Sequence, residues 1–304
     1  MAYKLDSLLP EYVKQNENEL LYKSVFGSAS VERFSKQLGV KGKAAINLLS
    51  TDVTFGDGSS CGFTPAGDAT FSQRDIVTGI IKVNMEFCHK SLIGKYTEHE
   101  VKIGANQETM PFEEEISNSI ADGIKAALET AVWQGNTASD DDNLNRFDGL
   151  VKILDADVPA ANKVALSGDS AWAHIKEVWK KVPRAARRKA GLKINVSPEL
   201  YDSFIMELVE KNLYHYPSAQ NAAPMEFVLP GTNVPVVSVD GLAGTKKVIA
   251  AVDSNIYYGT DYMGNEEEFS MWYSKDNDTF RVKVEWNAGV QVAFPDEVVV
   301  GTIA

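Results

Sequence analysis

The residues best suited to metal binding or covalent catalysis are few and scattered. The chain contains four histidines and two cysteines, namely His89, His99, His174, His215, Cys61 and Cys88. Cys88, His89 and His99 would supply half of a zinc site, but no second Cys or His pair with familiar spacing completes a tetrahedral set. Two cysteines do not make a disulfide framework either, which favours a reduced environment during folding. We therefore predict no metal site.

Sequence motifs for binding phosphate or calcium are also incomplete. Gly56-Asp57-Gly58 is followed by a glycine one residue too late for a dinucleotide-binding G-x-G-x-x-G. Residues 241–246 lack the spacing of a P-loop, and no H-E-x-x-H occurs. Asp140, Asp141 and Asp142 lack the spaced ligands and the closing glutamate of a calcium loop. We predict no catalytic residues and no cofactor. The missing motifs favour a structural role over an enzymatic one.

Composition limits the class of protein. The 304 residues suffice for about two domains, and the apolar content of 44% is typical of a soluble globular chain. No segment is apolar enough to span a membrane, and residues 1–15 do not resemble a secretory signal. The net charge of −12 disfavours non-specific nucleic-acid binding by the surface as a whole.

The dominant element is a long helix predicted over residues 111–134. Pro111 suits the first helical position, three glutamates follow in the first turn, and Gly135 marks the end. The apolar positions recur every four residues, at Phe112, Ile116, Ile120, Ile124, Leu128 and Val132. The polar positions are Glu115, Asn118, Asp122, Lys125 and Glu129. Because a spacing of four overshoots each turn, the apolar stripe winds around the helix and should touch several neighbours.

The segments before this helix need a surface to lie on. Residues 1–50 contain two short amphipathic pieces, 8–22 and 31–38, which are too short to be stable alone. They dock either on the chain's own domain or on another subunit. Residues 44–96 alternate between apolar and polar side chains around a tip rich in Gly, Ser and Pro, which predicts a long hairpin. Such a hairpin is marginal in isolation and also needs a partner surface.

The segments after the helix predict an α/β unit followed by strands. Residues 164–260 contain two amphipathic helices and several strands, and a basic stretch, RAARRKAG, lies between the helices. These cations either complement a helix C-terminus or contact phosphate. Near the end of the chain, residues 280–286 and 290–294 alternate as strands, with a turn expected at Asn287-Ala288-Gly289.

This order of elements resembles the major capsid proteins of tailed bacteriophages, which have the Hong Kong 97-type fold. The passages that resemble the family are TAVWQGNTASDDDNLNRFDGLVKIL, AGLKINVSPELYDSFIMELVEKN, LPGTNVPVVSVDGLAGTKKVIAAVDSNIYYGTDY and RVKVEWNAGVQVAFPDEVVV. The resemblance implies an α+β fold of four parts. These are an N-terminal arm (1–50), an E-loop hairpin (51–96), a peripheral domain (97–145 and 262–304) with spine helix 111–134, and an axial domain (146–261).

The resemblance also implies a function and partners. The chain is expected to assemble into hexamers and pentamers of an icosahedral virion capsid in the host bacterial cytoplasm, around double-stranded DNA bound without sequence specificity. Because the arm starts at Met1, the resemblance implies either a separate scaffolding protein or none, together with a portal. It leaves open whether decoration proteins bind. Some relatives join subunits through a lysine on the hairpin, but residues 44–81 contain no lysine. The alternatives are an encapsulin-type compartment shell, or an enzyme whose site is not readable in the sequence.

Two sets of residues carry these expectations. The predicted inter-subunit contacts are Phe55, Phe63, Phe71, Phe112, Ile116, Ile120, Ile124 and Leu128. The expected DNA-facing residues are Arg184, Arg187, Arg188 and Lys189.

Overall fold

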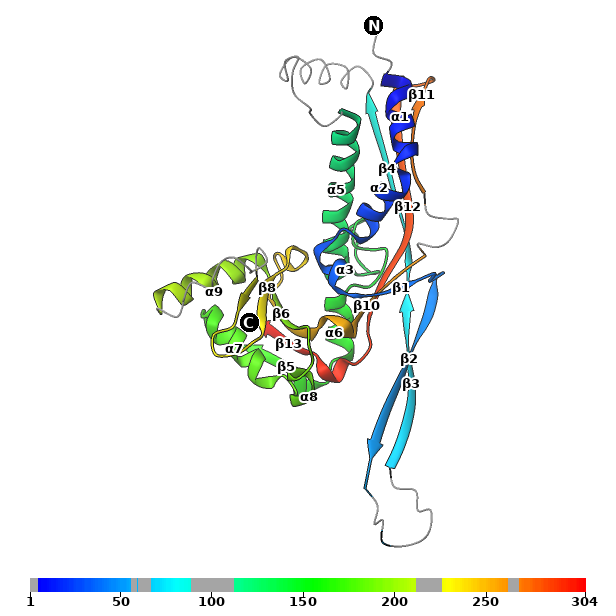
Figure 1. Cartoon of the computed structure of the whole chain (residues 1–304). Coiled ribbons are helices and arrows are strands. Elements are labelled where there is room, and N and C mark those ends of the chain that lie inside the picture. Colours follow the sequence, from blue (N-terminus) through cyan, green and yellow to red (C-terminus); the bar gives the residue numbers. More distant parts are fainter. Residues whose placement is uncertain (1–4, 56–58, 60–66, 89–111, 212–225, 262–267) are drawn as a thin grey trace.

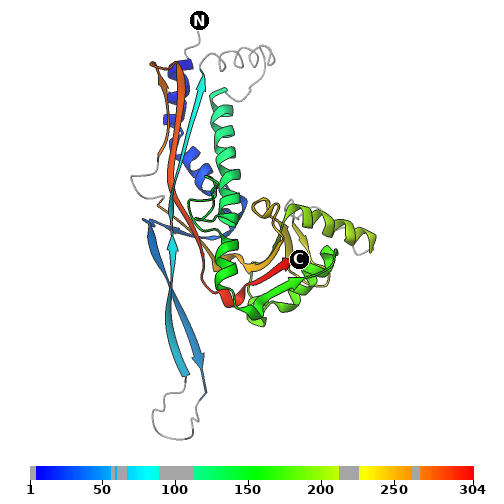
Figure 2. The ribbon, with the colours of Figure 1, turned by 180° about the vertical axis from the view of Figure 1, so that it is seen from behind.

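The computed structural model describes residues 5–55, 59, 67–88, 112–211, 226–261 and 268–304. Figure 1 shows an upright stem, a compact lobe on one side of the stem, and a two-stranded hairpin that projects below both. The view from behind in Figure 2 shows the same three parts. The stem and the lobe contain most of the buried apolar side chains, whereas the lower part of the hairpin is exposed.

The long helix α5 (Phe112–Gln134) runs through the stem and confirms the predicted element. Ile120, Ile124, Leu128 and Val132 are all buried, and Trp133 beside them is buried as well. They belong to one core that also includes side chains from the N-terminal helices and from the stem sheet. The winding stripe therefore contacts several elements of the same subunit.

Close backbone approach determines where α5 ends. The N–H group of Gly149 donates to the carbonyl of Gly135 over 2.8 Å, and a Cβ on either glycine would collide with the backbone of the opposite segment. Gly135 is not in the left-handed region, so the glycine is needed for space rather than for a positive φ. The chain then returns along α5 and forms α6 (Leu150–Asp157).

The N-terminal helices are docked on the chain's own stem. α1 (Leu5–Gln15) and α2 (Glu17–Phe26) pack against α5 and strand β11, and α3 (Ala29–Arg33) follows. Leu9, Val13, Leu20 and Val25 are buried there. This docking decides between the two alternatives for the arm. The second amphipathic piece is split, because 35–38 pairs with a sheet edge as β1 (Ser35–Leu38) instead of continuing as helix.

The stem sheet has five strands in the order β1-β10-β12-β11, with β4 also paired to β12. Its other members are β4 (Gly79–Cys88), β10 (Ile256–Thr260), β11 (Glu268–Ser274) and β12 (Thr279–Val292). The turn predicted at 287–289 is wrong, since β12 continues straight through it. Its partners hold it extended: Ala288 is opposite Gly79 of β4, and Gly289 is opposite Gly259 of β10.

The lobe is built on a six-stranded sheet in the order β5-β13-β9-β6-β8-β7. Its strands are β5 (Lys163–Leu166), β6 (Leu192–Val196), β7 (Glu226–Val228), β8 (Pro235–Ser238), β9 (Lys247–Val252) and β13 (Val299–Ile303). The helices α7 (Ala171–Lys181), α8 (Arg184–Arg187) and α9 (Pro198–Glu210) belong to the lobe. In β9, Val248 and Ala250 pack in the lobe core, whereas Ile249 and Ala251 pack in the stem core. The sheet is therefore buried on both faces and joins the two parts.

Short 3-10 turns connect these elements at Ala160–Asn162, Asp240–Leu242 (η3), Asp253–Asn255 (η4) and Pro295–Glu297. The hairpin consists of β2 (Lys43–Val53) and β3 (Gly67–Val77). It therefore begins earlier than the predicted 51–96 and ends earlier too, because β4 leaves it to pair with β12.

Two further strands belong to a different part of the structure from the one that the predicted domain boundaries gave them. β13 belongs to the lobe sheet rather than to a peripheral segment 262–304, since it pairs with β5 and β9. β10 belongs to the stem sheet rather than to the lobe, since it pairs with β1 and β12. Both differences arise from long-range strand pairing.

Candidate assembly surfaces

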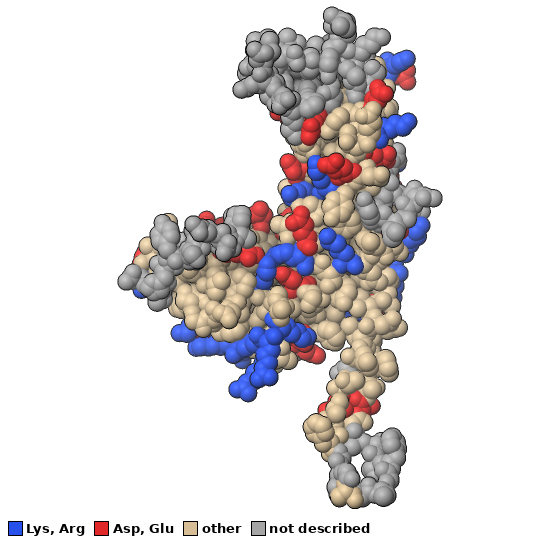
Figure 3. Space-filling model, viewed as in Figure 1, with Lys and Arg blue, Asp and Glu red and all other residues tan. Residues whose placement is uncertain are grey.

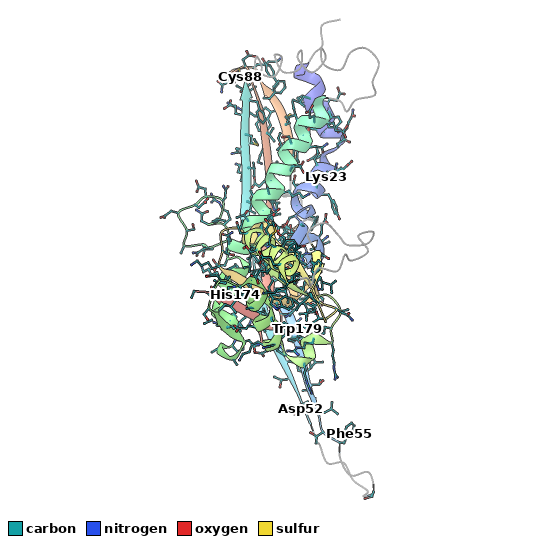
Figure 4. The ribbon with its side chains drawn as sticks, turned by 90° about the vertical axis from the view of Figure 1, so that its left-hand side faces the viewer. Lys23, Asp52, Phe55, Cys88, His174 and Trp179 are labelled. Atoms are coloured by element: carbon teal, nitrogen blue, oxygen red, sulfur yellow. The ribbon has the colours of Figure 1, made fainter. Side chains whose placement is uncertain are left out.

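The hairpin has one apolar face that no other described segment of the subunit covers. In an antiparallel pair, directly opposed residues lie on the same face. The register pairs Leu49 with Phe71, Thr51 with Ala69, and Val53 with Gly67, and Phe55 follows two residues later. Phe71 is 79% exposed and Phe55 is 96% exposed. We call Leu49, Val53, Phe55, Ala69 and Phe71 the apolar hairpin face; Phe55 lies near the lower end of the hairpin in Figure 4.

The opposite face of the hairpin is polar over its lower half. There the register places Ser50 opposite Thr70 and Asp52 opposite Asp68. Nearer the stem the same face is buried, with Ile46 and Ile76 packed against the body of the subunit. The projecting half is thus an amphipathic ribbon, and a ribbon of two strands alone is marginally stable in water.

Polar contacts fix the base of the hairpin to the stem. Arg74 forms an ion pair with Asp157 of α6 and donates to the side chain of Gln291 over 3.2 Å. Gln291 in turn donates to the carbonyl of Asp75 over 2.8 Å, and Lys43 pairs with Asp75 across the strands at 2.9 Å. The apolar face is therefore presented by an anchored support.

A groove of about 550 Å³ lies in the stem between β4, α5 and the segment that follows α5. Its apolar lining consists of Ile80, Ile81, Val83, Ile124, Ala127, Leu128, Ala131 and Trp286. Its polar lining consists of Lys82, Asn84, Asp142, Asn143 and Arg146. The groove can thus accept apolar side chains between charged and amide groups.

The residues suited to catalysis or metal binding do not converge in the parts that the structure describes. Within those parts, no three His, Cys, Asp or Glu side chains are placed to hold a metal ion. His174 is buried in α7, whereas His89, His99, His215 and Cys61 lie outside the described residues. The letters Gly58-Ser59-Ser60-Cys61-Gly62 spell a G-x-S-x-G, but all of them except Ser59 lie outside the described residues. No helix in the described ranges is long and apolar enough to span a membrane.

Comparison with known proteins identifies the fold. No protein-family model and no curated relative matches the sequence. The structure is similar to a procapsid of satellite phage P4 that includes a size determination protein, with a TM-score of 0.66 and 12% identity over 94% of this chain and 90% of that chain. It is similar to a structure from Microbacterium phage Oxtober96, with a TM-score of 0.56 and 13% identity over 91% of each chain. The chain has the Hong Kong 97-type capsid fold.

A related match shows that the fold also occurs outside viruses. The holo-SrpI encapsulin complex from Synechococcus elongatus PCC 7942 is similar with a TM-score of 0.52 and 12% identity, over 90% of this chain and 85% of that chain. In the terms of this fold, α1 to α3 form the N-terminal arm, β2 and β3 form the E-loop, and α5 is the spine helix. The stem sheet belongs to the peripheral domain and the lobe is the axial domain.

The predicted contact residues fall into three groups. Phe55 and Phe71 are exposed on the E-loop, as a contact with a neighbour requires. Phe63 and the side chain of Phe112 lie outside the described residues, and Ile116 is partly buried against the stem core. The expectation for Ile120 is corrected, because it is buried in the core that the spine helix shares with the N-terminal helices and the stem sheet. Ile124 and Leu128 are buried in the same core but also line the stem groove, so their contact with a neighbour stays a prediction.

The basic residues expected to face DNA are also divided. Arg187 stacks on Trp179, with its guanidinium carbon 4.6 Å from the ring centre, and donates to the carbonyls of Trp179 and Lys180. Lys189 pairs with Glu297 at 2.6 Å. Arg184 and Arg188 are exposed on and beside α8. Half of the set therefore has a structural role within the axial domain.

A buried carboxylate joins the N-terminal arm to the spine helix, and sequence reasoning missed it. Glu129 was grouped with the polar positions of the helix but is buried, and it accepts hydrogen bonds from Ser28 and from the backbone N–H and hydroxyl of Ser30. The indole N–H of Trp133 donates to the Ser30 hydroxyl over 2.8 Å. The available signal was the position of Glu129 directly beside the apolar stripe. These contacts satisfy a charge that would otherwise be costly to bury.

A second polar cluster joins the arm to the axial domain. Asp253 lies between Arg33 of α3, at 3.9 Å, and Lys193 of β6, at 3.6 Å, and Lys193 also pairs with Glu226 at 2.8 Å. Burial raises the pKa of Asp253, although both cations act in the opposite direction. Arg33 also donates to Asn195 over 3.4 Å. The arm, the spine helix and the axial domain are thus held as one unit.

Proposed function

We propose that this chain is the major capsid protein of a tailed bacteriophage. It self-assembles through hexamers and pentamers into an icosahedral shell that encloses double-stranded DNA, inside the host bacterial cytoplasm. A portal, a separate scaffolding protein and decoration proteins would complete the particle. The proposal includes no enzymatic activity, because the subunit's distinctive features are surfaces and not a reaction site.

The apolar hairpin face carries this proposal. An exposed apolar patch of this kind marks an interaction site, since soluble monomers rarely present one on a projecting support. Figure 1 shows that the hairpin projects below the stem, away from α5, which lines the groove. We propose that it packs on that groove in a neighbouring subunit, where the apolar lining would cover Leu49, Val53 and Phe71.

The first experiment is purification of the full chain, followed by size-exclusion chromatography and negative-stain imaging. Closed particles in the megadalton range are expected. A small oligomer without particles would contradict the proposal and favour an enzyme. The second candidate is an encapsulin-type shell, which is favoured by the encapsulin match. The content of particles made in cells distinguishes the two candidates. Nucleic acid supports a phage capsid, and a protein cargo supports a compartment.

We predict that particles are not cross-linked by lysine–asparagine isopeptide bonds. Such a bond needs a lysine amine at a neighbour's amide, and residues 44–81 of the E-loop contain none. Lys43, at the base, is already paired with Asp75. Denaturing gel electrophoresis of mature particles should show a single band near the monomer mass of 33.3 kDa. A ladder of covalent multimers that resists reductant would contradict this prediction.

We predict that the isolated protein binds DNA weakly and without sequence preference. The net charge of −12 opposes approach of the phosphate backbone, and any contact through lysine or arginine releases counterions and weakens with salt. Fluorescence anisotropy with several unrelated duplexes should give equally weak binding that disappears as salt rises. Tight binding to one duplex that persists at high salt would be inconsistent with a shell protein of this kind.

A further inference from the structure

The axial domain carries opposite charges on two of its helical segments. Residues 171–191, which span α7 and α8, contain seven Lys or Arg residues and a single acidic residue, Glu177. Residues 198–211, which span α9, contain four acidic residues and one lysine. Figure 3 shows Lys and Arg gathered along the lower border of the domain. In a chain whose net charge is −12, this concentration of cations is a local feature.

The two segments are neighbours, since α7 packs against α9, but they cover different strands of the sheet. β5 and β7 are the two edge strands of the six-stranded sheet. α7 packs over β5, β13 and β9, whereas α9 packs over β8 beside β7. In Figure 1, α8 lies at the lower border of the axial domain and α9 lies along its upper left. The charge difference therefore runs from one side of the domain to the other.

Contacts within the chain use only part of each charged set. Glu207 accepts hydrogen bonds from the Ser170 hydroxyl and the Ala171 N–H at the start of α7, and it pairs with Lys211. Although burial acts to raise it, the pKa of Glu207 is lowered by these hydrogen bonds. Arg187 and Lys189 are held within the domain as described above. The exposed remainder forms a basic edge of Lys176, Lys180, Lys181, Arg184 and Arg188, and an acidic edge of Asp202 and Glu210.

The acidic edge also presents apolar surface. Met206 is 68% exposed and Val209 is 54% exposed on α9. Asp202, Met206, Val209 and Glu210 are spaced by four, seven and eight residues, so they share the outer face of the helix. This face has the composition of a protein contact, with apolar groups flanked by charge.

We propose that α9 of one copy of this chain packs against the basic edge of the next copy around a ring. This proposal rests on the proposed shell function and names the contact between its axial domains. Placing acidic and basic edges together attracts the correct neighbour, whereas pairing two α9 helices across a two-fold axis would bring like charges together. A head-to-tail contact of this kind generates closed rings, as hexamers and pentamers require. DNA at the basic edge would leave the acidic edge and its apolar residues without a partner.

A charge-swap experiment tests this contact with the full-length chain. The first variant combines Arg184→Glu with Arg188→Glu, the second combines Asp202→Lys with Glu210→Lys, and the third carries all four changes. All four positions are exposed, so the subunits should melt at the wild-type temperature. Each two-residue variant should lose at least about tenfold in particle yield at low salt, because it sets like charges against each other. The variant with all four changes should recover most of the yield, since its edges are again opposite in sign.

The control for the first variant makes the same change in net charge elsewhere, by combining Lys14→Glu with Lys275→Glu on the stem. It should assemble like wild type, and an equal loss there would show an effect of net charge alone and overturn the proposed contact. The proposed contact would also be overturned if the variant with all four changes did not recover its particle yield. Normal assembly of both two-residue variants, under conditions in which wild type forms particles, would overturn it as well. Normal shells of Arg184→Glu/Arg188→Glu that lack nucleic acid would assign the basic edge to DNA instead. If wild type itself forms no particles, the proposed function fails first.

Discussion

Phe71→Asp should abolish particle formation while leaving the subunit folded. Phe71 lies on the apolar hairpin face, is 79% exposed in the subunit and makes little contribution to the subunit core. In an assembled shell its ring would be covered, and its loss removes about 2 kcal/mol per contact, or roughly 30-fold in affinity. The new carboxylate adds the cost of burying a charge without a partner. Because every subunit makes this contact, the effect multiplies around the shell.

The measurement is particle yield by sedimentation and negative-stain imaging, together with the thermal melting temperature of the purified subunit. Ser72→Asp is the matched control, since Ser72 is the next residue on the same strand and is exposed, but lies on the opposite face of the hairpin. The control should assemble, and both variants should melt as wild type does. If Phe71→Asp assembles as well as Ser72→Asp, the hairpin face is not an assembly surface.

Ile124→Asp should destabilise the subunit itself. Ile124 is 5% exposed at the centre of the spine helix, within the core that the N-terminal helices and the stem sheet share. An aspartate there would be buried without an ion pair and would leave the apolar volume of isoleucine unfilled. The free energy of unfolding should fall by on the order of 4 kcal/mol or more, a large part of the stability of a typical domain.

Urea unfolding followed by circular dichroism measures this loss, and particle yield in cells should fall with it. Ala126→Asp on the same helix is the control, because Ala126 is exposed and its substitution should change the unfolding free energy by only about 0.5 kcal/mol. Equal unfolding midpoints for the two variants would contradict the placement of Ile124 in the core. The effects of the two substitutions are separable. Phe71→Asp affects the assembly of a stable subunit, whereas Ile124→Asp affects the stability of the subunit itself.

Sequence reasoning erred where the outcome depended on contacts between distant segments. Asn287-Ala288-Gly289 has the composition of a turn, yet β4 and β10 hold it as strand. Ile120 was expected to reach a neighbour, yet it is buried in the core that the N-terminal helices share within the same subunit. Glu129 was grouped with the polar positions of the helix, yet Ser28 and Ser30 satisfy it in the interior. In each case the local pattern was read correctly, and the partner lay about 30 to 200 residues away, beyond the range of any local pattern.

The sequence by itself determined the elements whose signals are short-range. Ser197-Pro198-Glu199 places the start of α9, where the Ser197 side chain accepts from the Leu200 N–H, and the fourfold apolar spacing places α5. The pattern along residues 44–96 predicts a hairpin, and the structure places its two strands at Lys43–Val53 and Gly67–Val77. Only the tertiary structure decided which apolar residues remain uncovered and at which border of the axial domain each set of charges lies. Strand periodicity predicts that one face is apolar. Whether the subunit or a neighbour covers that face depends on where the face lies in the folded chain.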